Sequence, residues 1–172
     1  MNASKVELTA SDFEELAEIV KLSQKVDRAD EDYVTSISAE IFQYQPFLLS
    51  VIIGYRFDLS AVELEEIMKN YFLVWESVKN NHKVFKTKVT KSKFEKSELK
   101  TKQMIFYLNK ETNQQDIFEG YFSRWGNLRS KALMTSIIHR YNTRDGLIEM
   151  KLETRGITLI GTLSFIECFE NL

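Results

Sequence analysis

Apolar residues recur every three to four positions along most of this chain, which is the period of one face of an α-helix. The clearest case lies at 60–78, where Ser60 and Glu63 have the S-x-x-E spacing of a helix N-terminal capping box. The apolar stripe that follows consists of Leu64, Ile67, Met68, Tyr71, Phe72, Trp75 and Val78. We therefore predict an amphipathic helix here, with this face turned to the core.

Three more helices are predicted in the first half of the chain. At about 11–29 an apolar stripe follows Ser11 and Glu14, which have the same capping-box spacing. At about 31–44 a second stripe follows a run of acidic residues, and acidic side chains favour a helix N-terminus. A short apolar helix at about 47–57 then pairs with the helix at 60–78 as an antiparallel hairpin, because the link between them is short.

Pro46 is the only proline, and it stands inside an apolar stripe. In the middle of a helix it would remove a backbone hydrogen bond and clash with the carbonyl of Phe42, at a cost of ~3 kcal/mol. At the first position of a new helix that cost largely disappears, since the missing N–H would be unpaired anyway. We therefore predict that the chain breaks between Gln45 and Pro46.

The segment 83–102 allows two structures. "VFKTKVTKSKF" alternates as a strand would, but Phe94, Thr101 and the apolar residues after them suit a helix capped by Thr90 or Ser92. We predict this helix at about 91–110 and another at about 113–126.

The C-terminal part contains a similar conflict. Residues 147–166 alternate well enough to form a β-hairpin that turns at 154–156. A predicted internal duplication favours helix instead. "FLLSVII" at 47–53 resembles "ALMTSII" at 132–138, and "NYFLVWESV" at 70–78 shares its apolar pattern with "GTLSFIECF" at 161–169.

The predicted fold is all-α: one compact domain, residues 1–172, made of antiparallel helical hairpins. The duplication divides it into two pseudo-repeats of about four helices each, at about 11–82 and about 90–170.

Composition fits a soluble globular protein, with 44% hydrophobic and 28% charged residues. Cys168 is the only cysteine, so no internal disulfide can form and a reducing compartment is expected. The first twenty residues hold no apolar stretch of signal-peptide length, and the apolar run after Pro46 is shorter than the ~20 residues that span a bilayer. We therefore expect a cytoplasmic protein without membrane contact.

The net charge of −2 conceals an uneven distribution. Residues 1–82 carry 7 Lys/Arg against 15 Asp/Glu, whereas residues 83–131 carry 12 against 5. The most basic part, 83–102, includes Lys88, Lys91 and Lys93, which are candidates for nucleic-acid or anionic-ligand binding. The simpler interpretation, a solvated face that balances the acidic half, is favoured because interleaved arginines and aromatics are missing.

A second candidate is the aromatic segment 118–131, which contains Arg124, Trp125 and Arg129. Trp and Arg are enriched at binding hot spots, and Arg can also stack on bases. Aromatic residues at helical spacing are more often a core face, so Trp125 is expected in the core, with both arginines solvated or paired.

The search for catalytic chemistry is negative. No nucleotide-binding or hydrolase fingerprint is present, and two histidines and one cysteine make a metal site improbable, so no cofactor is expected. Cys168 beside His139 would be a nucleophile, but its spacing favours a small buried hydrophobe. Glu76 and Glu167, which align across the duplication, are expected to be exposed helix-end residues rather than paired carboxylates.

The leading functional hypothesis is a non-enzymatic helical domain that binds another protein or a second copy of itself. The alternative is nucleic-acid or anionic-ligand binding through the Lys-rich segment 83–102. An enzyme built from dispersed residues ranks third.

Overall fold

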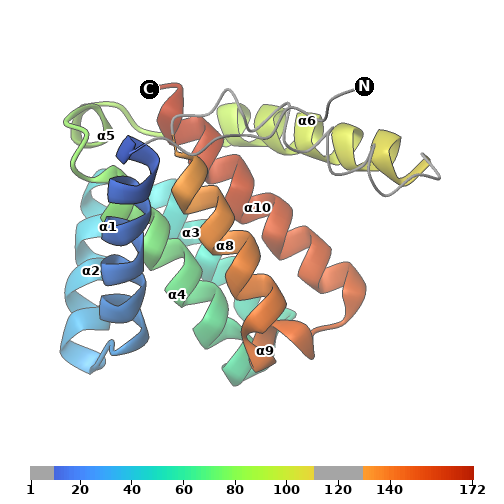
Figure 1. The fold of residues 1–172 in the computed structure, drawn as a ribbon, viewed down its shortest axis with the longest axis horizontal. Helices are drawn as coiled ribbons and strands as arrows, with labels where there is room; N and C mark the ends of the chain where they lie inside the picture. The colour runs from blue at the N-terminus through green and yellow to red at the C-terminus, as the bar shows by residue number, and fades with distance from the viewer. Residues whose placement is uncertain (1–9, 111–129) are drawn as a thin grey trace.

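The computed structural model describes residues 10–110 and 130–172, except for the side chains of 104–110, and every regular element in these ranges is a helix (Figure 1). In chain order they are α1 (Ala10–Asp27), α2 (Glu31–Tyr44), α3 (Pro46–Gly54), the 3₁₀ helix η1 (Tyr55–Phe57), α4 (Ala61–Val78), α5 (Lys83–Lys86), α6 (Lys91–Lys110), α8 (Lys131–Thr143), α9 (Asp145–Ile148) and α10 (Leu152–Glu170). The all-α prediction is confirmed. The strand alternatives at the start of α6 and in 147–166 are wrong, and the helix predicted at about 113–126 lies outside the described residues.

Side-chain caps fix where three of the helices begin. Ser60 Oγ accepts from the backbone N–H of Glu63 at 3.3 Å, and Glu63 Oε2 accepts from the N–H of Ser60 at 2.7 Å, so the predicted capping box before α4 is confirmed. Asp30 caps α2 by accepting from the backbone N–H of Tyr33 at 2.8 Å. Thr90 Oγ1 accepts from the N–H of Lys93 at 3.3 Å in the first turn of α6. The capping box expected at Ser11 is wrong, because α1 already begins at Ala10.

The break at Pro46 is also confirmed. Helix α2 ends at Tyr44, and Pro46 is the first residue of α3, where its missing N–H costs nothing. Gln45 joins the two helices with φ −136° and ψ 63°, which no α-helix contains.

The side chain of Gln45 is almost completely buried and holds a distant loop in place. Its Nε2 donates to the carbonyl of Val84 at 2.6 Å and to that of Thr87 at 2.9 Å, while its Oε1 accepts from the N–H of Val89 at 2.8 Å. One side chain therefore satisfies three backbone groups in the segment that leads from α5 into α6. Gln45 thus positions the first turn of α6.

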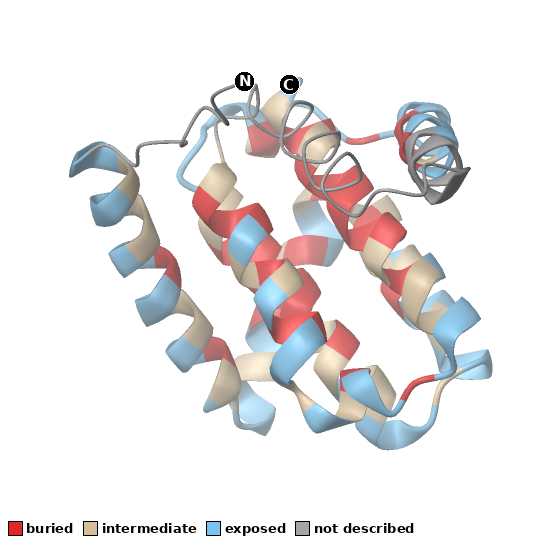
Figure 2. Cartoon of the chain, turned by 45° about the vertical axis from the view of Figure 1, so that its right-hand side comes forward, coloured by how far each residue is buried: buried red, intermediate tan, exposed pale blue. Residues whose placement is uncertain are grey.

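Helix α4 is the centre of the molecule. It contacts α1, α3, α8, α9 and α10, and its residues from Asn70 to Glu76 are all buried. Figure 2 shows the buried residues gathered on the inner helices and the exposed residues on the outer faces. The stripe predicted for this helix supplies the largest fully buried side chains, Trp75 and Tyr71.

Aromatic side chains join α4, α6 and α10. The ring of Phe165 stacks on that of Phe94 with centroids 4.5 Å apart, and it meets Tyr71 edge-on at 5.7 Å. The ring of Trp75 lies 6.4 Å from that of Phe169. These contacts run along α10, so one continuous aromatic core joins α10 to α4 on one side and to α6 on the other.

Arg140 ties α8 to α1 and α4 from inside the protein. Its Nε donates to Asn70 Oδ1 at 2.7 Å, and its Nη1 donates to Ser23 Oγ at 2.9 Å and to Asp27 Oδ1 at 2.8 Å. Arg144 also bonds to Asp27. A buried guanidinium needs such partners on several sides, and here they come from two helices, α1 and α4.

Within the described ranges, no helix has both the length and the apolar character needed to cross a membrane.

Candidate anion-binding groove

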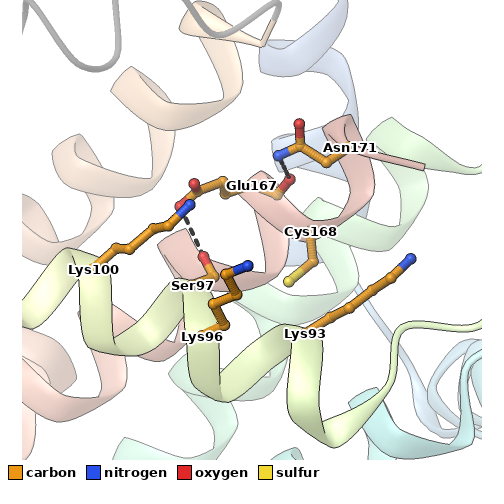
Figure 3. A pocket seen from close by; sticks show the side chains of 7 residues that line it. All are labelled: Lys93, Lys96, Ser97, Lys100, Glu167, Cys168 and Asn171. Atoms are coloured by element: carbon orange, nitrogen blue, oxygen red, sulfur yellow. Dashed lines mark hydrogen bonds between the residues drawn. The ribbon is translucent and has the colours of Figure 1, made fainter.

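A groove of about 240 Å³ lies between α6 and the end of α10 (Figure 3). Its lining consists of Lys93, Lys96, Ser97, Lys100, Glu167, Cys168 and Asn171. Three lysines and one glutamate give this lining a net charge of +2.

The three lysines of the groove follow from the way α6 packs. Phe94, Ser97 and Thr101 form its buried face, at the spacing of one side of a helix. Lys93, Lys96 and Lys100 then fall on the neighbouring stripe, at positions i, i+3 and i+7, and they are exposed. Because α6 packs along α10, this stripe borders the seam between the two helices.

The side of α10 contributes the floor of the groove. Ser97 Oγ donates to Glu167 Oε2 at 2.7 Å, which joins the two helices beneath the lysines. Asn171 donates twice to the carbonyl oxygen of Glu167, from its backbone N–H at 3.2 Å and from Nδ2 at 2.8 Å. These bonds satisfy a carbonyl at the helix C-terminus, which would otherwise present partial negative charge to the groove.

Cys168 lies in the floor and is almost fully buried. Burial raises the pKa of its thiol to about 11, and the charge of Glu167 acts in the same direction. The thiol therefore stays protonated at neutral pH and adds no negative charge to the groove.

The lysines differ in their surroundings. Figure 3 shows the side chain of Lys100 extending toward Glu167, whereas Lys93 and Lys96 extend along the side of the groove nearer Cys168. Among the described residues, no carboxylate forms an ion pair with Lys93 or Lys96. The positive charge of the groove is therefore concentrated on these two ammonium groups.

Of the residues that the sequence singled out, Lys93 lines the groove. Lys88 is exposed in the loop before α6, and Lys91 pairs with Glu95 one turn further along at 3.6 Å, so both stand outside the lining. Arg124, Trp125 and Arg129 lie outside the described residues.

Sequence reasoning missed Lys96, Ser97, Lys100 and Asn171, and it considered Glu167 and Cys168 only for other chemistry. The spacing of Lys93, Lys96 and Lys100 on one predicted helix was a usable signal for Lys96 and Lys100. Nothing local marks Glu167, Cys168 or Asn171, because they meet α6 only through tertiary packing.

The two glutamates matched in the duplication do not form a pair. Glu76 bonds to Lys25, Tyr33 and Lys79, while Glu167 bonds to Ser97. The expectation that Glu76 is an exposed helix-end residue is wrong, since it is only 5% exposed and stands in the buried stretch of α4.

The other candidate catalytic residues, Cys168 and His139, do not lie side by side. Cys168 is buried as expected, and His139 is exposed on a different helix, α8. In the part of the chain that the structure describes, no group of three or more His, Cys, Asp or Glu residues is arranged to hold a metal ion.

Comparisons with protein-family models, with curated proteins and with solved structures found no match to this chain.

Proposed function

We propose that this chain is a non-enzymatic helical domain that binds a partner protein by holding an anionic side-chain group of that partner in the α6–α10 groove. The observation that carries the proposal is the stripe of Lys93, Lys96 and Lys100 along one wall of a concave site. A single positive ion in such a hollow attracts an anion weakly in water. Several positive charges that converge in a partly enclosed site attract an anion more strongly.

The state of Lys93 and Lys96 supports this proposal. Both ammonium groups stand beside a neutral thiol and near a capped helix end, and no carboxylate of the described residues neutralises them. Salt bridges satisfy other lysines of the same helix, so the pattern of pairing on α6 leaves this stretch open to a ligand.

A protein partner fits the groove better than an extended nucleic acid. The positive stripe is short, because Lys91 pairs with Glu95 at 3.6 Å before it and Lys102 pairs with Glu98 at 3.1 Å after it. Nucleic-acid sites instead follow the backbone over several phosphates and add aromatic rings for stacking, and among the described residues no aromatic side chain lines this groove. The single cysteine supports a cytoplasmic location for the interaction.

The test is affinity capture from the source cells at near-physiological salt, after nuclease treatment, with three forms of the chain as bait. These are the wild type, K93Q/K96Q and the control K91Q/K102Q, which removes the same charge from paired positions of the same helix. The proposal expects a stoichiometric protein partner that the wild type and the control retain and that K93Q/K96Q loses. Circular dichroism checks that all three baits are folded.

Two results would overturn the proposal. A partner that K93Q/K96Q binds as well as the wild type does would show that recognition lies elsewhere on the surface. Loss of all partners after nuclease treatment would assign the lysines to nucleic acid instead.

A further inference from the structure

We infer that the anionic group held in the groove is a phosphate monoester, carried on a phosphorylated serine or threonine side chain of the partner. This inference rests on the proposed function, and it names the chemistry that the same groove selects. Three features of the site carry it: the charge available, the room available and the number of donors.

The charge of the groove matches a dianion. Its lining has a net charge of +2, and the two lysines without an ion pair among the described residues, Lys93 and Lys96, are one helical turn apart. A phosphorylated side chain carries about −1.5 to −2 charges at pH 7, so it balances both ammonium groups. A carboxylate carries one charge and leaves the second ammonium uncompensated.

The room in the groove fits a compact group. Its volume of about 240 Å³ is below the roughly 300–1,000 Å³ of sites that enclose drug-sized ligands. On α6 itself, the pairs Lys91–Glu95 and Lys102–Glu98 neutralise the lysines on either side of the groove, so a longer polyanion meets no continuing positive stripe along the described part of this helix. A single phosphorylated side chain needs neither more volume nor a longer stripe.

The donors also favour phosphate. Each ammonium group has three N–H donors, and the phosphate presents three oxygens that accept from different directions. Ser97 Oγ and one of the two N–H groups of Asn171 Nδ2 already donate to Glu167, so the lysines are the main donors that the described lining offers to the ligand. Lysine acts as a point charge and does not require the planar fit of a carboxylate to arginine.

The experiment is a titration of the ¹⁵N-labelled full chain, followed by amide chemical shifts. The probes are N-acetyl-O-phosphoserine amide, its carboxylate counterpart N-acetyl-glutamate amide, and inorganic phosphate. We expect the phosphoserine probe to shift the amides of Lys93, Lys96, Cys168 and Asn171 and to bind about threefold more tightly than the glutamate probe. K93Q/K96Q should lower the affinity for the phosphoserine probe by about tenfold, and K91Q/K102Q should leave that affinity within about twofold of the wild-type value.

The outcomes separate the inference from the proposed function. Equal binding of the phosphoserine and glutamate probes at these amides would overturn the phosphate assignment and leave anion binding in place. Shifts at the groove with inorganic phosphate alone would identify a free-anion site and overturn the side-chain source. No shift at these amides with any probe would overturn both, and so would equal binding by K93Q/K96Q.

Discussion

Glu76 is a carboxylate at the centre of a polar cluster where three helices meet. Its Oε1 accepts from Lys25 Nζ at 3.0 Å, from the Tyr33 hydroxyl at 3.1 Å and from Lys79 Nζ at 3.3 Å. Burial by itself opposes ionisation of this group, but the bonds and charges of the two lysines outweigh it and hold the pKa of Glu76 below its ordinary value of 4.5. The charged form is therefore the one that the fold stabilises.

This lowered pKa predicts a pH-dependent contribution to stability. A group whose pKa is lower in the folded than in the unfolded state stabilises the fold above its unfolded pKa, and this contribution is lost as the pH falls through the folded value. Glu76→Gln should therefore cost about 1–2 kcal/mol of unfolding free energy at pH 7, and the gap to the wild type should shrink as the pH falls below 4.5, the ordinary pKa of this group. Urea denaturation at a series of pH values measures the gap.

Glu65→Gln is the matched control on the same helix. Glu65 is exposed and pairs with Lys69 at 2.6 Å, so its loss should cost no more than about 0.5 kcal/mol. If the gap between Glu76→Gln and the wild type were the same at pH 3 as at pH 7, the stabilised carboxylate at Glu76 would be refuted.

At this scale the sequence predicted what depends on near neighbours. The roles of Ser60 and Glu63 follow from a three-residue spacing, and the structure confirms them. The burial of Glu76 could not be predicted, because it depends on Lys25 and Tyr33, which are more than forty positions away in the chain. Its i+3 neighbour Lys79 indicated no more than an ordinary surface pair.

Among the elements, α10 contains two glycines in contrasting surroundings. A Cβ added to Gly161 would lie 2.4 Å from Tyr55 Oη and 3.0 Å from Tyr71 Oη, whereas one added to Gly156 would meet nothing within 4 Å. The two hydroxyl groups are 3.2 Å apart and hydrogen-bonded to each other. Gly161 thus provides the space on α10 in which Tyr55 of η1 and Tyr71 of α4 come together.

Alanine at these two positions should have opposite effects. Gly156→Ala should stabilise the protein by about 0.5–1 kcal/mol, because alanine is the better helix former and the site is open. Gly161→Ala should destabilise it by about 1–2 kcal/mol, because the tyrosine hydroxyls must move. Urea denaturation at neutral pH measures both.

A double-mutant cycle connects the second effect to its cause. Tyr55→Phe removes the closest oxygen, so Gly161→Ala should cost less in that background than in the wild type. A cost that is the same in both backgrounds would show that the crowding comes from elsewhere.

The elements themselves were largely predictable. Pro46, the capping residues and the apolar stripes each act within one or two turns, so they show where helices begin and which face is buried. The segment 147–166 was ambiguous because its alternating pattern suits a strand as well. There the local β-propensity of its threonines and isoleucines loses to packing on α4 and α6.

On the scale of the whole molecule, Gln45 joins parts of the chain that lie about forty residues apart. Gln45→Ala would leave two carbonyls and the N–H of Val89 without their partner in a buried place, so the unfolding free energy should fall by about 2–4 kcal/mol. Gln43→Ala, on the exposed face of α2, should change it by less than about 0.5 kcal/mol. Equal midpoints in urea for the two variants would contradict this role.

The duplication and the groove also concern the whole molecule, and neither can be established from the sequence alone, because both depend on how distant segments pack. The aligned windows lie in α3 and α8 and in α4 and α10. Helices α1, α2 and α6 show that helical structure is common to most of the described chain, so it does not test the duplication, and the two pseudo-repeats stay a prediction. The groove required knowing that α6 packs on α10, a contact between residues about seventy positions apart. Neither the period of the apolar residues nor the number of charged residues shows which helices pack together.

The bonds from Gln45 also have a consequence for proteolysis. The segment between α4 and α6 carries Lys83, Lys86 and Lys88, which makes it the obvious place for trypsin to cut. A protease cuts chain that opens locally, and here the backbone on both sides of Lys86 and Lys88 is hydrogen-bonded to a buried side chain. The rate of tryptic cleavage at these lysines therefore measures how often Gln45, at the α2–α3 junction, releases the loop. Each such release also frees the first turn of α6, which forms one wall of the groove.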